Sequence, residues 1–431
     1  MAHLDSAGWS VAQDAADADL IIVNSCGFID DAKQESIDAV LEWRGLYPGK
    51  KILLAGCLAQ RYAKDLAESL PEVDGFFGTD DITKIAGAVK SLGWDEDKSL
   101  PGGGAEGQPE LLTASRPLLS LPGSAYVKIS EGCDNNCSYC AIPLIRGPLR
   151  CRAVLDIVEE CRGLLARGVR ELCIIGQDIG SYRSGDSGLP ELLAAISGLS
   201  GDFWVRLLYM HPDHFPLPVL DLMERDRRFL PYFDIPFQHA SGQILSAMNR
   251  RGTADAYLAL VQTIRGRLPA AVIRTTFLVG FPGETAADFA ALLDFQEKLR
   301  PDWLGCFSYS REDGTAAYDM PGRVPKKTAL ARKREVEERQ VGITEKNMDR
   351  FVGQTFEVLL EEKINVDADG AECEDMWLGR LYCHAPEVDG AAVIAGALSG
   401  AEKAGDMLPC KVIARSGFDL EVRLGVSSDC L

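Results

Sequence analysis

The first 95 residues alternate short apolar runs with a longer amphipathic stretch. Residues 19–25 (DLIIVNS) and 51–56 (KILLAG) have the apolar pattern of buried strands, and residues 31–43 between them have the spacing of a helix. This order predicts an N-terminal α/β domain. Cys26 and Cys57 each come just after a strand. Ligands of open α/β sheets lie at that edge, so these two cysteines could converge on one site.

The next stretch is rich in Gly, Pro, Ser and charge, with the string GGGAEGQPE at its centre. Such a composition is typical of a linker. We therefore place the N-terminal domain at residues 1–95 and a linker at 96–123, and we expect a second domain to begin at residue 124.

From residue 124 to residue 350 strand-like runs alternate with helix-like runs. This alternation predicts a parallel sheet wound with helices, about six βα units in all, and hence a partial or full barrel. A charged helix at residues 326–350 leads out of it. The strand-like runs are 125–130, 171–176, 204–209, 232–237, 272–280 and 304–310, and the helix-like runs are 154–167, 189–196, 218–225, 244–248, 254–267 and 285–299.

The last part of the chain, residues 351–431, offers about five short strands with turns between them. Such a segment has the outline of a small β-barrel. The strands are expected at residues 355–360, 376–382, 391–396, 407–414 and 418–424.

Composition narrows the class of protein. Hydrophobic residues make up 46% and charged residues 25% of the chain, and no apolar run approaches the roughly 20 residues of a membrane span. The N-terminus has no pattern of a signal peptide. We therefore expect no membrane segment and a place in the cytoplasm.

The charge and the cysteines point to a protein partner and to metal chemistry. The chain has 45 Lys and Arg against 64 Asp and Glu, a net charge of −19, which disfavours a general nucleic-acid binder. Its 13 cysteines, without a secretory signal, do not suggest a disulfide framework, so metal ligands, nucleophiles or buried thiols remain.

Three cysteines stand close together in the string EGCDNNCSYCAIPLIRG, directly after the first strand of the central domain. Cys133, Cys137 and Cys140 have the spacing Cys-x3-Cys-x2-Cys. A structural zinc site would need four ligands, and no second pair with suitable spacing lies nearby. Three thiolates on an iron–sulfur cubane leave one iron open to bind a substrate. The pattern therefore favours an iron–sulfur site, with zinc or inert thiols as the alternatives.

This motif resembles the signature of the radical S-adenosylmethionine superfamily, and its surroundings resemble the methylthiotransferases within that superfamily. The likeness covers nearly the whole chain. The strings that carry it are NSCGFIDDAKQESIDAVLE and AGCLAQRY in the N-terminal domain and IGQDIGSY, RLLYMHPDHF, DIPFQHAS, MNRRGT and RTTFLVGFPGET in the central barrel, and the tail resembles the TRAM β-barrel.

The resemblance implies a role for the three clustered cysteines and their neighbour. Cys133, Cys137 and Cys140 would ligate a [4Fe–4S] cluster whose open iron binds S-adenosylmethionine, and reductive cleavage would give a 5′-deoxyadenosyl radical. Tyr139 would pack beside the adenine; a place in the core is an equally open interpretation.

Other residues would line the cofactor or substrate cleft of the barrel, although for each a structural hydrogen bond is an equally open role. The glycine and the carboxylate of the string GFPGE, Gly280 and Glu284, would help to cradle the cofactor. The remaining candidates lie at strand ends: Gln177, Asp178, Asp234, Gln238 and His239.

Cys26 and Cys57 would ligate a second, auxiliary cluster that handles the inserted sulfur. Members of the family normally carry a third cysteine on a loop upstream, and this chain has none before Cys26. The opening string MAHLDSAGW resembles the part that normally follows the first strand. We therefore expect a segment ahead of it to be missing and the auxiliary site to be incomplete.

Two branches of the family compete for the substrate. One methylthiolates a modified adenosine in tRNA, and the other an aspartate of a small-subunit ribosomal protein. From Val352 onward the chain has 6 Lys and Arg against 15 Asp and Glu, a balance of −9, which would repel RNA and suit a basic protein. The strings HAPEVDG, GQD and DIPFQHAS also resemble the protein branch. We expect no direct tRNA binding.

The expected enzyme is thus a transferase that uses two molecules of S-adenosylmethionine, an electron donor and a sulfur donor to modify the β-carbon of an aspartate. The radical would attack an unactivated C–H bond that acid–base groups alone do not break. An alternative of another class is a non-catalytic metal-binding protein that docks on ribosomes.

Overall fold

The computed structural model describes residues 2–92, 118, 120–366, 374–394, 398 and 400–425. Contacts divide the chain into two units. The first comprises the described residues up to 92 with Ser130–Arg152 and Ser310–Met320, and the second comprises the described parts of Leu118–Ile129, Ala153–Tyr309 and Pro321–Leu431. Most of the predicted linker lies outside the described residues. The domain boundaries at 95, 124 and 350 stay predictions.

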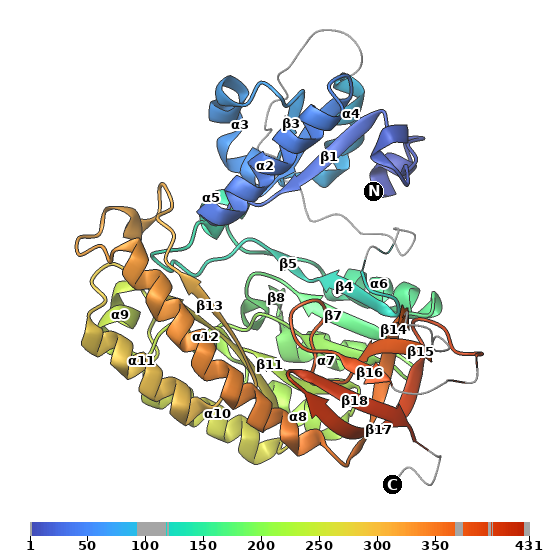
Figure 1. The fold of residues 1–431 in the computed structure, drawn as a ribbon, viewed down its shortest axis with the longest axis vertical. Helices are drawn as coiled ribbons and strands as arrows, with labels where there is room; N and C mark the ends of the chain where they lie inside the picture. The colour runs from blue at the N-terminus through green and yellow to red at the C-terminus, as the bar shows by residue number, and fades with distance from the viewer. Residues whose placement is uncertain are drawn as a thin grey trace. The chain divides into compact units, whose positions relative to one another are not determined.

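The first unit contains a parallel sheet with both faces covered. Ile52 and Leu54 of the central strand pack with Val40 on one face, whereas Leu53 packs with Val89 on the other. Alternate side chains of a strand point to opposite faces, so the apolar run KILLAG is buried on both. The sheet has the order β1 (Leu20–Ser25), β2 (Lys51–Gly56), β3 (Gly75–Phe77), and its helices are α1 (Ala2–Asp5), α2 (Asp30–Leu46), α3 (Cys57–Ser69) and α4 (Ile85–Ser91) (Figure 1).

The second unit contains the predicted sheet of six parallel strands. Strands that lie next to each other in this sheet also follow one another along the chain, apart from short strand pairs that lie outside the sheet, as in a partial barrel. From one edge to the other it runs β13 (Trp303–Ser308), β12 (Val272–Val279), β11 (Phe229–Asp234), β10 (Trp204–Leu207), β7 (Glu171–Ile175), β4 (Ser124–Lys128). The helices are α6 (Val154–Ala166), α7 (Leu189–Ser197), α8 (Pro218–Arg225), α9 (Gly242–Ala247), α10 (Ala254–Arg267), α11 (Ala286–Leu299) and α12 (Lys326–Met348), and a small hairpin joins β8 (Arg183–Ser184) to β9 (Ser187–Gly188).

Helices cover the outer side of this sheet, and α12 lies along β13 (Figure 1). Gln340 of α12 donates to the carbonyl of Pro301 at 2.9 Å, just before β13 begins. The central βα domain expected from the sequence is therefore confirmed, with element ends displaced by a few residues.

The tail forms the predicted closed barrel of five strands. Its core is continuous with that of the sheet, because Tyr232 and Trp303 belong to the same buried cluster as Val358 and Leu381. Trp303 also donates through Nε1 to the carbonyl of Cys383 at 2.7 Å. The strands are β14 (Thr355–Val366), β15 (Glu374–Arg380), β16 (Ala392–Ile394), β18 (Asp419–Leu424) and β17 (Met407–Ser416), and residues 395 and 396 of the strand expected at 391–396 lie outside the described residues.

Within the described ranges, none of the helices combines the length and the apolar character that a membrane crossing requires.

Candidate functional site

Cys26 and Cys57 lie at the same edge of the N-terminal sheet. β1 and β2 are paired in register up to Ser25 and Gly56, so each cysteine follows one member of that pair. A Cβ atom on Gly27 would lie 2.7 Å from the carbonyl carbon of Cys57, so the two backbones touch. Cys57 is half-buried, whereas Cys26 is exposed. The backbone next to Cys26 thus lies against that of Cys57, and a shared site for the two thiols stays a prediction.

The three-cysteine loop is closed at its base by backbone contacts. β5 (Ser130–Glu131) pairs with β6 (Arg150–Cys151), and the N–H of Cys133 donates to the carbonyl of Gly147 at 3.2 Å. Gly132 has a φ of +78°, and a Cβ atom there would stand 2.2 Å from the carbonyl oxygen of Pro148. Glycine is therefore required at this position, and the base of the loop has a fixed shape.

The thiols of Cys133, Cys137 and Cys140 are all partly exposed on this loop, with half-buried Tyr139 beside the third. The N–H of Cys140 donates to the carbonyl of Cys137 at 3.0 Å, and the N–H of Asn135 donates to Sγ of Cys133 at 3.4 Å. Within the described ranges no three His, Cys, Asp or Glu side chains are grouped so that they could hold a metal ion. The structure thus puts the three thiols on one loop without drawing them together.

This loop fits an iron–sulfur cluster by the chemistry of its donors. It carries three partly exposed cysteines on a short segment whose ends are held by backbone hydrogen bonds, and the N–H of Asn135 already donates to one sulfur. Iron–sulfur clusters are held by cysteine thiolates, and hydrogen bonds to the sulfurs tune them.

Two charged side chains of the first unit were not predicted from the sequence, and one of them contacts a cysteine. Arg146, the last residue of α5 (Ile142–Arg146), donates through Nη2 to Sγ of Cys57 at 3.4 Å. Glu312, only 1% exposed, accepts from Arg61 at 2.6 Å and from Lys33 at 3.0 Å. Arg146 stands within the quoted cysteine string, so its basic character was visible there, whereas nothing in the sequence links Glu312 to residues so far away.

Gln177 and Asp178 follow β7 in the second unit, as expected. The carboxylate of Asp178 accepts from the backbone N–H groups of Gly180 at 3.1 Å and His211 at 3.0 Å, and from the Ser181 hydroxyl at 2.6 Å. Asp178 therefore stabilises the loop that follows β7 through these hydrogen bonds. Oε1 of Gln177, in contrast, is buried with no hydrogen-bond partner within the described residues. Such an atom fits a bound polar ligand such as S-adenosylmethionine.

Asp234 and Gln238 stand at and beyond the end of β11. Asp234 is 2% exposed, and burial raises the pKa of its carboxyl group against the opposing effect of Arg274, which lies 3.3 Å away. Gln238 has a φ of +68°, and its N–H donates to the carbonyl of Thr276 at 2.8 Å. This bridge fixes a left-handed turn at the strand end.

Glu284 organises the GFPGE turn from inside. Its carboxylate accepts from the N–H groups of Gly280 and Phe281 and lies 3.2 Å from the guanidinium of Arg332 on α12. His239, fully buried, lies 3.8 Å from the same carboxylate. The turn is therefore held by a buried carboxylate, and a role of Glu284 in binding the cofactor stays a prediction.

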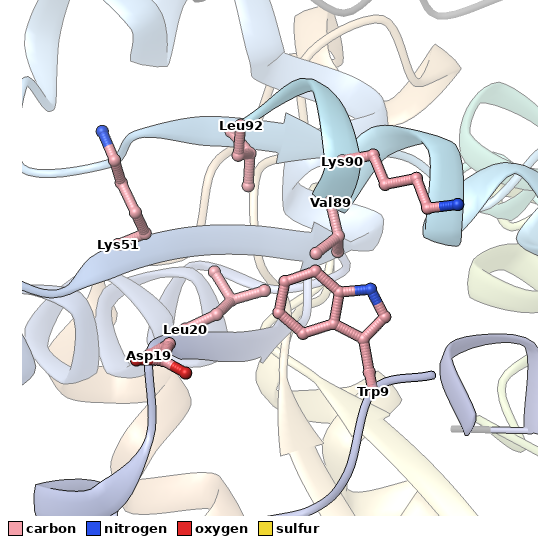
Figure 2. A pocket seen from close by; sticks show the side chains of 7 residues that line it. All are labelled: Trp9, Asp19, Leu20, Lys51, Val89, Lys90 and Leu92. Carbon is pink, nitrogen blue, oxygen red and sulfur yellow. The ribbon is translucent and has the colours of Figure 1, made fainter. Parts of the chain in front are cut away.

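A separate cavity of about 240 Å³ lies in the first unit (Figure 2). Trp9 and Leu20 face Val89 and Leu92 across it, and Lys51 stands at its rim (Figure 2). None of the residues that line it is a cysteine or was predicted for the site.

Comparison with protein families divides the chain into three matched segments. Residues 1–78 match the uncharacterized protein family UPF0004, residues 127–295 match the radical SAM superfamily, and residues 352–424 match the TRAM domain.

Curated relatives match over almost the whole length. The chain is 44% identical to the ribosomal protein uS12 methylthiotransferase RimO of Treponema denticola, over 97% of this chain and 95% of that protein. It is 41% identical to the protein of the same name from Pelotomaculum thermopropionicum, over 97% and 89%. A radical S-adenosylmethionine methyltransferase, TsrM from Kitasatospora setae, solved with cobalamin and a [4Fe–4S] cluster, shares the fold at a TM-score of 0.53 and 17% identity, over 70% and 67%.

The fold and these matches define a radical S-adenosylmethionine enzyme, a transferase that uses an iron–sulfur cluster and S-adenosylmethionine. The chain belongs to the family of ribosomal protein uS12 methylthiotransferases called RimO. The family expected from the cysteine motif is confirmed, and the non-catalytic alternative is not supported.

Proposed function

We propose that this chain attaches a methylthio group to the β-carbon of an aspartate in ribosomal protein uS12. The observation that carries the proposal is the identity of 44% and 41% to relatives named for that reaction, over 97% of the chain in both cases. The balance of −9 charges from Val352 onward also suits a basic protein better than tRNA. Modification of an adenosine in tRNA is thus the less favoured alternative.

The cysteine loop would hold the radical-generating [4Fe–4S] cluster through Cys133, Cys137 and Cys140. When bound, the cluster and S-adenosylmethionine supply a carbon radical able to take hydrogen from an unactivated C–H bond. Tyr139 would lie by the adenine. The pinned base of the loop would keep the three ligands in place while this chemistry proceeds.

In the second unit, Gln177 would hydrogen-bond the cofactor with its buried Oε1, which makes no hydrogen bond to described residues. Asp178 and Glu284 would keep their loops in shape, since both accept hydrogen bonds from backbone N–H groups. Asp234 and Gln238 would line the cleft at the strand ends.

A second cluster would take two of its ligands from Cys26 and Cys57, which follow the paired ends of β1 and β2, and it would need further ligands besides these two thiols. This site would handle the sulfur that is transferred, and one of two S-adenosylmethionine molecules would methylate that sulfur. The partners would be uS12, an electron donor and a sulfur donor. Because uS12 is a ribosomal protein, we expect the enzyme to act in the cytoplasm.

The test is the intact mass of uS12 after anaerobic incubation with the reconstituted chain, S-adenosylmethionine, sulfide and a reductant. We expect a gain of one methylthio group, placed on an aspartate by fragmentation. A parallel reaction with tRNA should leave its adenosines unchanged. An unmodified uS12 together with methylthiolated tRNA would reject the proposal in favour of the alternative.

A further inference from the structure

The sulfur of Cys57 has a cationic neighbour that belongs to the three-cysteine loop. Arg146 lies six residues beyond Cys140 and ends α5, which packs against α3, the helix that begins at Cys57. Its Nη2 approaches Sγ of Cys57 to 3.4 Å. The loop proposed for the first cluster therefore carries a positive charge to the cysteine proposed for the second.

The guanidinium of Arg146 is anchored on one side and directed at sulfur on the other. Nη1 donates to Oε1 of Glu131. The side chain of Arg146 is 25% exposed and that of Glu131 only 9%. Because a guanidinium is planar with donors on a rigid fork, fixing one arm on a carboxylate fixes the direction of the other. Sγ of Cys57 lies in that direction.

Arg146 brings a full positive charge and an N–H donor to this sulfur at the point where α3 begins. Hydrogen bonds to sulfur and net charge are the features with which a protein sets the potential of an iron–sulfur site.

We propose that Arg146 is a positioning residue of the methylthiotransfer site, which holds a donor and a positive charge against the Cys57 sulfur and so raises the reduction potential of the cluster bound there. This inference rests on the proposed role of Cys57 as a cluster ligand. The physical reason is that reduction adds negative charge to the cluster, and a nearby cation stabilises the more negative state.

A variant that lacks both Arg146 and the negative charge of Glu131 separates an effect on the sulfur from a merely structural role. If Arg146 served to neutralise this buried carboxylate, then removing both charges would restore the wild-type properties. If Arg146 acts on sulfur, the Glu131→Gln/Arg146→Gln double variant still lacks its cation and keeps a lowered potential. The two roles therefore separate in one comparison.

The experiment is an anaerobic redox titration of the reconstituted full chain, followed by electron paramagnetic resonance. The signal of the second cluster is defined as the part that a Cys26→Ala/Cys57→Ala variant loses. We expect Arg146→Gln to shift that signal to a lower potential, with iron per chain unchanged, and the double variant with Glu131→Gln to stay shifted. Arg162→Gln, which removes an exposed arginine of α6 paired with Glu159, should leave the potential where it was.

An unshifted potential in Arg146→Gln, or its return to the wild-type value in the double variant, would overturn the inference. If Arg146→Gln fails to retain the second cluster, Arg146→Lys decides: recovery of the cluster with the restored charge supports the inference, and equal loss rejects it. A wild-type chain with no signal that depends on Cys57 would instead show that the proposed second cluster is wrong, and the inference would fall with it.

Discussion

Arg206 donates through Nε to Oε1 of Glu171 at 2.7 Å, and neither side chain is exposed to solvent. A second cation comes from the tail barrel, because Arg380 of β15 also donates to the carboxylate of Glu171 and to the Ser124 hydroxyl. Burial opposes the charge of Glu171, but the two arginines outweigh it and lower the pKa of this carboxyl group to about 2. Within the second unit, these buried ion pairs therefore hold the tail barrel against the parallel sheet.

Arg380→Ala is expected to destabilise the second unit strongly. The substitution leaves Glu171 with one of its two cations and leaves the Ser124 hydroxyl without this donor. Removing one partner of a buried ion pair costs about 3–5 kcal/mol. Denaturant unfolding, followed by the fluorescence of the buried tryptophans Trp204, Trp303 and Trp377, would measure this loss.

Arg415→Ala is the matched control, because Arg415 pairs with Asp349, whose side chain is 57% exposed. An exposed pair contributes about 0–1 kcal/mol. Equal effects of the two substitutions would mean that the buried network does not stabilise the junction.

The buried carboxyl group of Asp389 predicts a dependence of stability on pH. Burial raises its pKa from 3.8 to about 6, against the effect of Arg274, and Oδ2 accepts from the hydroxyl of Tyr232 at 2.6 Å. A carboxyl group with a raised pKa binds its proton more tightly in the folded state, so its contribution to stability falls as the pH rises from 3.8 to about 6.

Asp389→Asn removes this titration. The difference in melting temperature between the variant and the wild type should therefore move in favour of the variant as the pH rises through that window. Asp319→Asn, at a carboxyl group that is 90% exposed, should show no such trend. A constant difference for Asp389→Asn would contradict the prediction.

Much of the fold followed from local pattern. The strand expected at residues 19–25 is β1 (Leu20–Ser25), and the helix expected at 285–299 is α11 (Ala286–Leu299), with Thr285 as its N-cap. Apolar runs and capping residues act over a few positions, so one sequence suffices to locate them. The edge shared by Cys26 and Cys57 also followed, since parallel strands end on the same side.

Contacts between distant segments could not be read in this way. The structure assigns Ser310–Met320 to the first unit, and Glu312 is held there by Lys33 and Arg61. These pairs are separated by 279 and 251 positions, and nothing in the local pattern selects one lysine among many. Likewise, the sequence shows that Arg146 is basic but not that its side chain lies beside the sulfur of Cys57.

Gly132→Ala tests whether the shape of the cysteine loop matters for the cluster. The new Cβ atom would stand 2.2 Å from the carbonyl oxygen of Pro148 at a φ of +78°. The strain is about 1–3 kcal/mol or more, and it acts on the base of the loop beside Cys133. We expect less iron and sulfide per chain after reconstitution and a matching loss of 5′-deoxyadenosine release.

The control for this variant is Gly266→Ala. Gly266 lies inside α10 with open space around it, so alanine there is expected to stabilise the helix by up to about 1 kcal/mol and to leave the iron content unchanged. Full iron content in Gly132→Ala would show that the closed base is not needed to assemble the cluster.

Gln177→Leu is expected to weaken the binding of S-adenosylmethionine. Loss of the Oε1 atom is not expected to destabilise the free protein. That atom is buried and makes no hydrogen bond within the described part of the chain, so no bond of this oxygen is lost in the free protein. A hydrogen bond gained on binding is worth about 0.5–1.5 kcal/mol, and its loss raises Kd by roughly two- to thirteenfold. Calorimetry on the reconstituted chain would measure the affinity, and thermal unfolding would measure the stability.

Gln262→Leu is the matched control, because Gln262 is an exposed residue of α10. An unchanged Kd in Gln177→Leu would remove Gln177 from the cofactor site, whereas a large loss of stability would assign it a structural role.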